Sequence, residues 1–267
     1  MKFLLRILLV AFLFSSCTSK LGKVLKSKDS EYKLKMAEQY YAQKKYSSAQ
    51  QVFEDVMPFY RGSDKYEDMF YKYAYCSYYL KDYINAESLF KTFTENFPNS
   101  TRIEECDYMH CYCYYKQSPK PELDQTPTSK TISLMQAFIN THPQSARTKE
   151  ASEIIDACRA KLELKEYKSA MLYFDMGGYN YRAAAISFTT LVEDFPDSEK
   201  SDEYMLMVIK SYYKFAQLSV IDKQVERYEK VISTCADFSD RFPNSKMSQE
   251  VSDFKTLSET NIKNLQK

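Results

Sequence analysis

The chain has 267 residues, with 37 lysines and arginines against 36 aspartates and glutamates. This balance leaves no broad basic field, so a nucleic-acid partner is not expected. Only 4 glycines and no tryptophan occur beside 24 tyrosines and 17 phenylalanines, and no long stretch alternates apolar with polar residues as a half-buried strand would. These features predict an all-α protein.

The first 16 residues have the pattern of a secretory signal peptide. Lys2 and Arg6 precede the apolar run 7–14, which is too short for a membrane-spanning helix of about 20 residues. Small residues stand directly before Cys17, as in the signals of bacterial lipoproteins, whose cysteine is lipidated and becomes the first residue of the mature chain. We therefore expect residues 1–16 to be removed and Cys17 to carry lipid. The alternative is an ordinary signal peptide with a chance cysteine.

The residues after Cys17 predict the membrane address. Thr18 stands where an aspartate retains many lipoproteins in the inner membrane, so the outer membrane is the expected location. Acidic clusters after the cysteine accompany surface export in some bacterial groups, and none follows here, so the periplasmic face is expected. Residues 17–30 are polar and predict a lipidated tether. We expect no cofactor beyond this covalent lipid.

Four short segments, called seams below, predict boundaries between repeated units. Each holds a ring-bearing residue, a proline, a polar residue and a serine: Phe97-Pro98-Asn99-Ser100, His142-Pro143-Gln144-Ser145, Phe195-Pro196-Asp197-Ser198 and Phe242-Pro243-Asn244-Ser245. They recur at intervals of 45, 53 and 47 residues, which is typical of a repeat array. Proline cannot continue a helix and serine can cap the next one, so each seam should end one helix and begin another.

The residues before each seam indicate the kind of repeat. In the clearest copy, Ala74 and Ala86 stand where two helices would approach closely, and Phe90 and Phe93 stand where they would interlock before Pro98. This order resembles the tetratricopeptide repeat, a helix-turn-helix of about 34 residues. The resemblance predicts an α-solenoid of about five repeats, closed by a C-terminal capping helix.

Other patterns predict how these repeats are organised. The segment from Thr148 to Met176 has helical patterning without a breaker, and Gly177-Gly178 should end it. We expect this long helix to join an N-terminal half with repeats one to three, residues 31–145, to the rest of the chain. Residues 146–267 would then hold the long helix, repeats four and five, and the final helix.

Two helix starts have the spacing of a capping box, in which an acceptor is followed three residues later by an acid. They are Asp64 with Glu67 and Thr101 with Glu104.

Tyrosines recur on the first helices of the N-terminal repeats. Two triplets have the spacing i, i+4 and i+7, and one tyrosine of the preceding repeat completes the set: Tyr41, Tyr71, Tyr75, Tyr78, Tyr108, Tyr112 and Tyr115. This side of the helix usually lines the groove of tetratricopeptide arrays, so we expect a groove that binds an extended peptide with aromatic residues. The alternative is that these tyrosines pack between helices.

Catalytic and metal-binding patterns are missing from the sequence. It has two histidines, no glycine-rich phosphate loop, no Gly-x-Ser-x-Gly and no His-Glu-x-x-His, so we do not expect an enzyme. Six cysteines follow Cys17, but none forms a Cys-x-x-Cys pair of the kind zinc sites use. We expect small core residues and no metal, with a disulfide between helices left open.

The most specific stretch of the chain runs from Lys161 to Ser198. It contains Glu166-Tyr167-x-x-Ala170, Tyr173-Phe174, Gly178, Tyr181-x-Ala183-Ala184 and Phe195-Pro196-Asp197-Ser198. With the lipidated cysteine, the five repeats and the long helix, this order resembles the BamD family, the tetratricopeptide lipoproteins of the outer-membrane β-barrel assembly machinery. The resemblance covers essentially the whole mature length.

This resemblance implies a non-enzymatic scaffold. Its N-terminal repeats would recognise unfolded β-barrel outer-membrane proteins, and its C-terminal repeats would dock on the periplasmic domains of BamA. Family members tend to carry a basic residue in the helix after Gly178; Ser187 fills that place here, and Arg182 is the candidate substitute. The alternative function is a pilotin-like lipoprotein that escorts a secretin or pilus subunit. A glycan-binding lipoprotein would favour tryptophan platforms and a longer chain.

Overall fold

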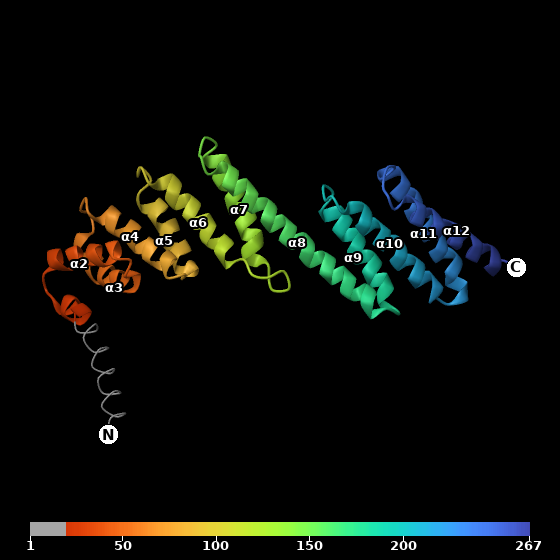
Figure 1. Cartoon of the computed structure of the whole chain (residues 1–267), viewed down its shortest axis with the longest axis horizontal. Helices are drawn as coiled ribbons and strands as arrows, with labels where there is room; N and C mark the ends of the chain where they lie inside the picture. Colours follow the sequence, from red (N-terminus) through yellow and green to blue (C-terminus); the bar gives the residue numbers. More distant parts are fainter. Residues whose placement is uncertain (1–19) are drawn as a thin grey trace, which may run out of the picture. The chain divides into compact units, whose positions relative to one another are not determined.

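The computed structural model describes residues 20–267, in which every regular element is a helix (Figure 1). The labelled helices are α2 (Ser30–Ala42), α3 (Tyr46–Val56), α4 (Tyr66–Tyr79), α5 (Tyr83–Asn96), α6 (Ile103–Gln117), α7 (Thr126–Thr141), α8 (Thr148–Met176), α9 (Asn180–Asp194), α10 (Ser201–Gln217), α11 (Ile221–Arg241) and α12 (Ser248–Leu265), and a short 3-10 turn follows α3. Helices that follow one another in sequence pack together, from α2 to α7 and again from α9 to α12. This confirms the predicted all-α tetratricopeptide-repeat architecture.

The seams share one backbone geometry. Helices α5, α7, α9 and α11 each end at the residue before a seam. The ring-bearing seam residue then adopts φ between −122° and −127° and ψ between 58° and 61° in all four copies. A proline disfavours the helical conformation in the residue before it, so the same sequence pattern ends each helix in the same way.

The seam serine joins two helices rather than capping one at its first residue. Its Oγ accepts a hydrogen bond from the backbone N–H two residues later, at 3.0 Å from Arg102 and 3.1 Å from Arg147. The same hydroxyl donates to a carboxylate from the preceding repeat, in four pairs: Ser100 with Glu67, Ser145 with Glu104, Ser198 with Glu163 and Ser245 with Asp202.

These bonds correct the two predicted capping boxes. The residues before α4 and α6 are Lys65 and Arg102, and neither makes a side-chain capping bond. Glu67 and Glu104 instead accept the seam serines of the following repeat. The local spacing was correct for a cap, but the partner lies in another repeat.

Residues 20–267 form two compact units. Unit 1 comprises residues 20–119 and Leu123–Cys158, and unit 2 comprises Lys120–Glu122 and Arg159–Lys267. The division falls within α8 because the first turns of this helix bury Ala151, Ile154, Ile155 and Cys158 in the core of unit 1. The later turns bury Ala170 in the core of unit 2.

The long helix ends as predicted. Helix α8 runs from Thr148 to Met176, and Gly177 and Gly178 follow with φ of 66° and 59°. Glycine adopts this left-handed conformation without the steric penalty that a Cβ brings.

Part of the expected tether is structured. Cys17 and the signal peptide lie outside the described residues, but residues 20–26 are helical. Val24 is only 1% exposed in a core cluster that Leu21 and Leu25 also contact. These three residues form an apolar stripe at helical spacing among the lysines, so a polar tether extends at most over residues 27–29 of the described part.

Candidate functional site

Six of the seven predicted tyrosines form a continuous array in unit 1. Rings from α4 and α6 meet in the order Tyr71, Tyr75, Tyr78, Tyr112 and Tyr108, with neighbouring centroids 4.8 to 6.4 Å apart. Tyr115 joins through Tyr112 at 5.8 Å. The recurrence after 37 residues thus reflects real adjacency, because equivalent positions on successive first helices lie side by side.

Tyr41, the seventh predicted tyrosine, joins the array indirectly, because its neighbour Tyr46 stacks on Tyr79 and Tyr79 contacts Tyr75. The Tyr41 ring packs edge-on against Tyr46 and Phe53 at 5.7 and 6.5 Å. It therefore supports the first repeat beside the tyrosine array.

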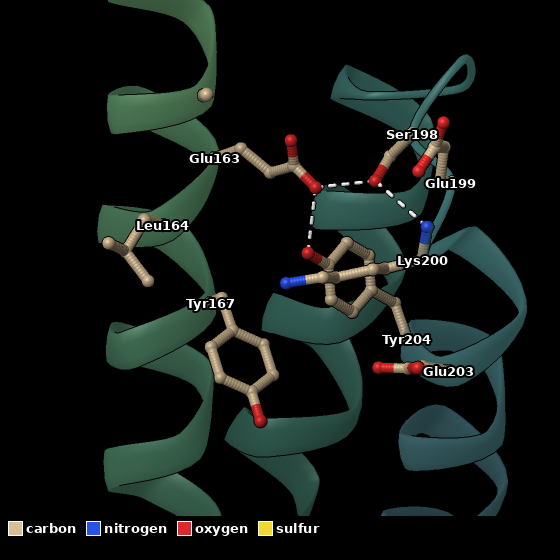
Figure 2. A pocket seen from close by; sticks show the side chains of 9 residues that line it. Glu163, Leu164, Tyr167, Ser198, Glu199, Lys200, Glu203 and Tyr204 are labelled. Atoms are coloured by element: carbon tan, nitrogen blue, oxygen red, sulfur yellow. Dashed lines mark hydrogen bonds between the residues drawn. The ribbon is translucent and has the colours of Figure 1, made fainter. Parts of the chain in front are cut away.

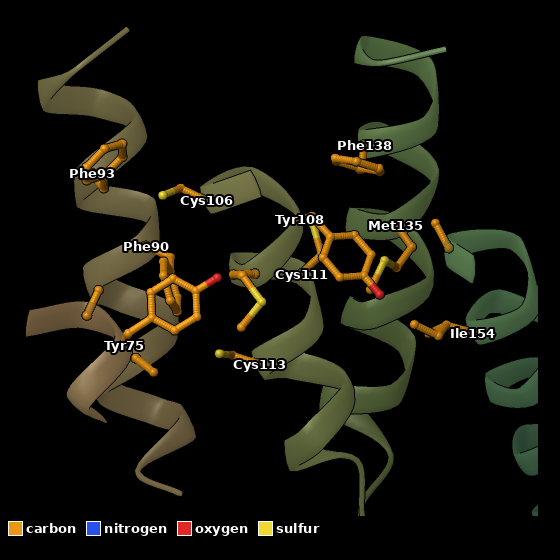
Figure 3. Close-up of a cluster of buried hydrophobic side chains, with 14 of the residues drawn as sticks. Tyr75, Phe90, Phe93, Cys106, Tyr108, Cys111, Cys113, Met135, Phe138 and Ile154 are labelled. Carbon is orange, nitrogen blue, oxygen red and sulfur yellow. The ribbon is translucent and has the colours of Figure 1, made fainter. Parts of the chain in front are cut away.

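Two members of the predicted groove are core residues. Tyr75 is 8% exposed and Tyr108 is 2% exposed, so they cannot line an open groove. Figure 3 shows Tyr108 beside Met135 and Phe138, and Tyr75 beside Phe90. Both face the following helix of their unit, which covers them. For these two residues the alternative of packing between helices is correct, whereas the other five predicted tyrosines are half-buried.

Glu105 organises the hydroxyl groups of the array. Tyr71 Oη donates to one carboxylate oxygen at 3.0 Å and Tyr75 Oη to the other at 2.5 Å. Burial and this carboxylate raise the pKa of Tyr71 to about 12. Burial and the same partner also raise the pKa of Tyr75. Both hydroxyls therefore remain donors, and each carboxylate oxygen of Glu105 accepts one of them.

Cations stack on the array, and sequence reasoning did not identify them. The Arg102 guanidinium lies 4.4 Å from the ring centre of Tyr71, and that of Arg147 lies 4.6 Å from Tyr108. Lys116 Nζ lies 4.9 Å from Tyr112. The signal available was the arginine two residues after each of the first two seam serines. Three cationic side chains thus lie against rings of the array, and Arg102 among them also pairs with Asp68.

Unit 2 contains a basic cavity around the predicted docking residue Arg182. The cavity holds about 350 Å³ and its cationic lining consists of Arg182, Lys223, Arg227 and Lys230. One carboxylate, Glu226, also lines it and pairs with Lys223 at 3.1 Å. The excess of cations can attract an acidic group.

Aromatic side chains orient two of these cations. The Arg227 guanidinium lies 4.0 Å from the ring centre of Phe215 and donates to Ser219 Oγ. Lys230 Nζ lies 5.9 Å from the Tyr212 ring. Ser187, the other predicted docking residue, is half-buried on α9 and does not line this cavity. Of the two predicted docking residues, only Arg182 lines the cavity.

A second cavity of unit 2, of about 460 Å³, lies beside the third seam (Figure 2). On its wall, Glu163 accepts hydrogen bonds from Ser198 Oγ and from Tyr204 Oη, the latter at 2.7 Å. Burial and Glu163 raise the pKa of Tyr204. The carboxylate is therefore engaged in holding α8 to the segment that leads into α10.

The six cysteines after Cys17 are all buried, which confirms their expected role as core residues. Three of them, Cys106, Cys111 and Cys113, appear in the cluster of Figure 3. Burial raises the pKa of each of these thiols to about 12. Within the described part of the chain, no three histidine, cysteine or acidic side chains are placed to hold a metal ion. Over residues 20–267, every helix is too short or too polar to cross a membrane.

Comparison with known proteins relates most of the chain to one family. Residues 27–224 match the model of the YfiO family, described as an outer membrane lipoprotein. No curated protein matches the chain. Among solved structures, a yeast Sti1 entity described as a TPR2AB domain in complex with pHSP90 aligns at 11% identity, covering 86% of this chain and 98% of its own, with a TM-score of 0.38. The apo form of RapI aligns at 14% identity, covering 91% and 89%, with a TM-score of 0.36.

Proposed function

Because the chain belongs to the YfiO family of outer membrane lipoproteins, also called BamD, we propose that it is a non-enzymatic scaffold of the outer-membrane β-barrel assembly machinery. It binds the periplasmic domains of BamA through unit 2 and unfolded barrel proteins through unit 1. Lipid on Cys17 holds it at the periplasmic face of the outer membrane. It needs no other cofactor.

The basic cavity around Arg182 is the observation that carries the docking part of this proposal. Cations oriented by aromatic rings and hydrogen bonds retain a defined geometry, so less side-chain entropy is lost when a carboxylate binds. Family members tend to carry a basic residue at the position of Ser187, and the cations of this cavity could replace it. An acidic loop of a BamA periplasmic domain is its proposed ligand.

Affinity capture from solubilised membranes tests this docking. The full-length lipoprotein should recover BamA, and the double variant Arg182→Glu/Arg227→Glu should recover about tenfold less, because two attractive contacts become repulsive. Arg159→Glu, at an exposed α8 position of the same unit, is the matched control and should recover as much BamA as the wild type. Equal recovery by the double variant would exclude the cavity as the docking site.

The tyrosine array supports the substrate-binding part of the proposal. Tyr78, Tyr112 and Tyr115 are half-buried and belong to the same array, so their remaining ring surface is available on unit 1. Tyrosine combines apolar ring area with a hydroxyl donor, which suits the aromatic residues and free backbone groups of an unfolded terminal strand.

Peptide binding to the full-length protein tests this assignment. We expect Tyr112→Ala/Tyr115→Ala to weaken binding of an aromatic terminal-strand peptide about tenfold, since such rings contribute on the order of 1 kcal/mol or more each at interfaces. Tyr179→Ala, a 91% exposed position in unit 2, is the control and should bind as the wild type does. If the double variant bound the peptide as tightly as the wild type does, the tyrosine array would not be the substrate-binding site.

The pilotin-like function is the competing proposal, since it requires the same anchor and repeats. The capture experiment separates the two. Recovery of a secretin or pilus subunit without BamA would overturn the assembly-machinery function.

A further inference from the structure

The helical segment 20–26 begins very close to the proposed site of lipidation. Only Thr18 and Ser19 separate Cys17 from Lys20, and a fully extended chain spans at most about 3.6 Å per residue. The first residue of this helix therefore lies within about 11 Å of the Cys17 backbone. A lipid that is attached to Cys17 and embedded in a bilayer thus holds the helix at the membrane surface.

This helix is packed onto the first repeat. Val24 is 1% exposed, and the core cluster that it shares with Leu21 and Leu25 also contains Leu34 of α2 and Phe53 of α3. Figure 1 shows the segment against the N-terminal end of unit 1. Because the helix and the repeat share a core, the short distance to the lipid brings the first repeat to the membrane as well.

The opposite face of the helix carries lysines. Lys20, Lys23 and Lys26 follow one another at intervals of three residues, and all three are exposed. At about 100° per residue they fall within an arc of about 120°, on the side away from the apolar stripe that enters the core. We call these three residues the lysine face. Lys28, which follows the helix, is exposed too.

The charge of the lysine face is not neutralised locally. Residues 17–28 contain four lysines and neither aspartate nor glutamate. The first acid, Asp29, accepts the backbone N–H groups of Glu31 and Tyr32 at the start of α2. No lysine of the lysine face forms an ion pair with any residue between 20 and 267.

We infer that the lysine face binds the anionic phospholipid headgroups of the leaflet in which the Cys17 lipid is embedded. Basic residues beside an anionic bilayer are attracted to its surface, and this attraction adds to that of a covalent lipid. The lipid holds the chain to the membrane, and the lysine face orients the first repeat on it. The inference rests on the proposed lipidation of Cys17 and adds a second membrane contact to it.

Vesicle binding by the mature chain without its lipid measures this second contact alone. Residues 17–267 with Cys17→Ser retain both compact units, so the fold is kept. Cosedimentation would compare phosphatidylethanolamine vesicles with and without phosphatidylglycerol. The protein should bind the anionic vesicles at least about tenfold more tightly, and high salt should remove the difference because exposed charges are screened.

Replacement of the lysine face tests which residues are responsible. Lys20→Gln/Lys23→Gln/Lys26→Gln should weaken binding to the anionic vesicles at least about tenfold, since each lysine near such a surface contributes about fivefold. The three side chains are exposed, so the variant should keep the helicity and the thermal midpoint of the parent protein.

The matched control removes the same charge from unit 2. Lys255, Lys263 and Lys267 are exposed in and after α12, and none of them forms an ion pair in the part of the chain that the structure describes. Lys255→Gln/Lys263→Gln/Lys267→Gln should therefore bind the anionic vesicles as the parent protein does.

A tryptophan locates the contact on the chain. The sequence contains no tryptophan, so Tyr32→Trp, at a 41% exposed position in the first turn of α2, introduces a single reporter close to the lysine face. Energy transfer from this reporter to dansyl-labelled headgroups should rise when the protein binds anionic vesicles. Combining Tyr32→Trp with the three substitutions of the lysine face should abolish that rise.

The outcomes that contradict the inference are distinct. Equal binding to both kinds of vesicle, equal weakening by the two triple variants, or vesicle binding without energy transfer from the reporter would overturn it. Reduced recovery of BamA by the lysine-face variant with unchanged vesicle binding would assign the face to a protein partner and would also overturn it. Failure of the proposed lipidation is read separately, from labelled palmitate on the wild type, because the vesicle assay uses protein without lipid.

Discussion

At the residue scale, a single hydroxyl joins neighbouring repeats. The seam serine hydroxyl accepts a hydrogen bond from a backbone N–H two residues later and donates a hydrogen bond to an acid of the repeat before, in all four copies. Hydrogen bonds to charged acceptors are about twice as strong as neutral ones. The serine therefore contributes both to helix initiation and to the fixed spacing of adjacent repeats.

Ser145→Ala tests this double role at the most buried of the four seams, where the side chain is 8% exposed. The change leaves Glu104 without its donor and the Arg147 N–H without its acceptor, so we expect a loss of about 1 to 3 kcal/mol in unfolding free energy. Urea denaturation provides the measurement. Ser152→Ala, at an exposed α8 position, is the control and should change the value by less than about 0.5 kcal/mol. A decrease in unfolding free energy no larger than that of the control would show that the seam serine does not stabilise the contact between repeats.

Titration of Tyr71 tests the environment of the array. Burial and Glu105 raise the pKa of Tyr71 from 10.0 to about 12, so the folded state holds this proton more tightly than the unfolded state does. The resulting stabilisation is complete below pH 10.0 and is lost as the pH rises towards about 12. The difference in tyrosinate absorbance between the wild type and Tyr71→Phe should therefore have its midpoint near pH 12. A midpoint near 10.0 would contradict the buried hydrogen bond, and Glu105→Gln should lower the midpoint.

At the element scale, local sequence signals were sufficient to predict where the helices begin and end. They were not sufficient to predict which residues of the adjacent repeat each helix contacts. The prolines of the seams and the pair Gly177-Gly178 set helix ends, because backbone sterics act within one or two residues. The partner of Glu67 and the burial of Tyr75 and Tyr108 depend on the adjacent repeat, which spacing along one helix cannot specify. Val24 was assigned to a polar tether because the lysines around it dominated the composition, although its own apolar stripe was present.

A matched pair of glycine substitutions tests the end of α8. A Cβ added at Gly178 or at Gly22 would meet no atom within 4 Å, but only Gly178 has a positive φ, of 59°. Gly178→Ala should therefore lower the unfolding free energy by about 1 to 2 kcal/mol through backbone strain alone. Gly22→Ala lies in the helical segment 20–26 and should raise it by up to about 1 kcal/mol. Thermal and urea unfolding of both variants would measure the contrast, and equal effects would argue against the left-handed helix end.

At the scale of the whole molecule, the positions of the charges are more informative about binding sites than the net charge is. The chain carries a formal net charge of +1, yet unit 2 gathers four cations against one carboxylate in one cavity. Unit 1 likewise leaves Arg147 unpaired while Arg102 is neutralised. Composition excluded a broad basic surface for a polyanion, but it could not locate these small basic sites, since they arise from residues that lie apart in sequence.

Replacement of Cys17 tests how the molecule as a whole is attached to the membrane. Cys17, which lies outside the described residues, is the proposed point of attachment through its lipid. We expect the wild type to incorporate labelled palmitate and to partition with outer membranes. Cys17→Ser should lose the label and be released by high salt, because only salt-sensitive contacts remain. An unlabelled wild type, or a Cys17→Ser variant that resists salt extraction, would require an attachment other than the lipid.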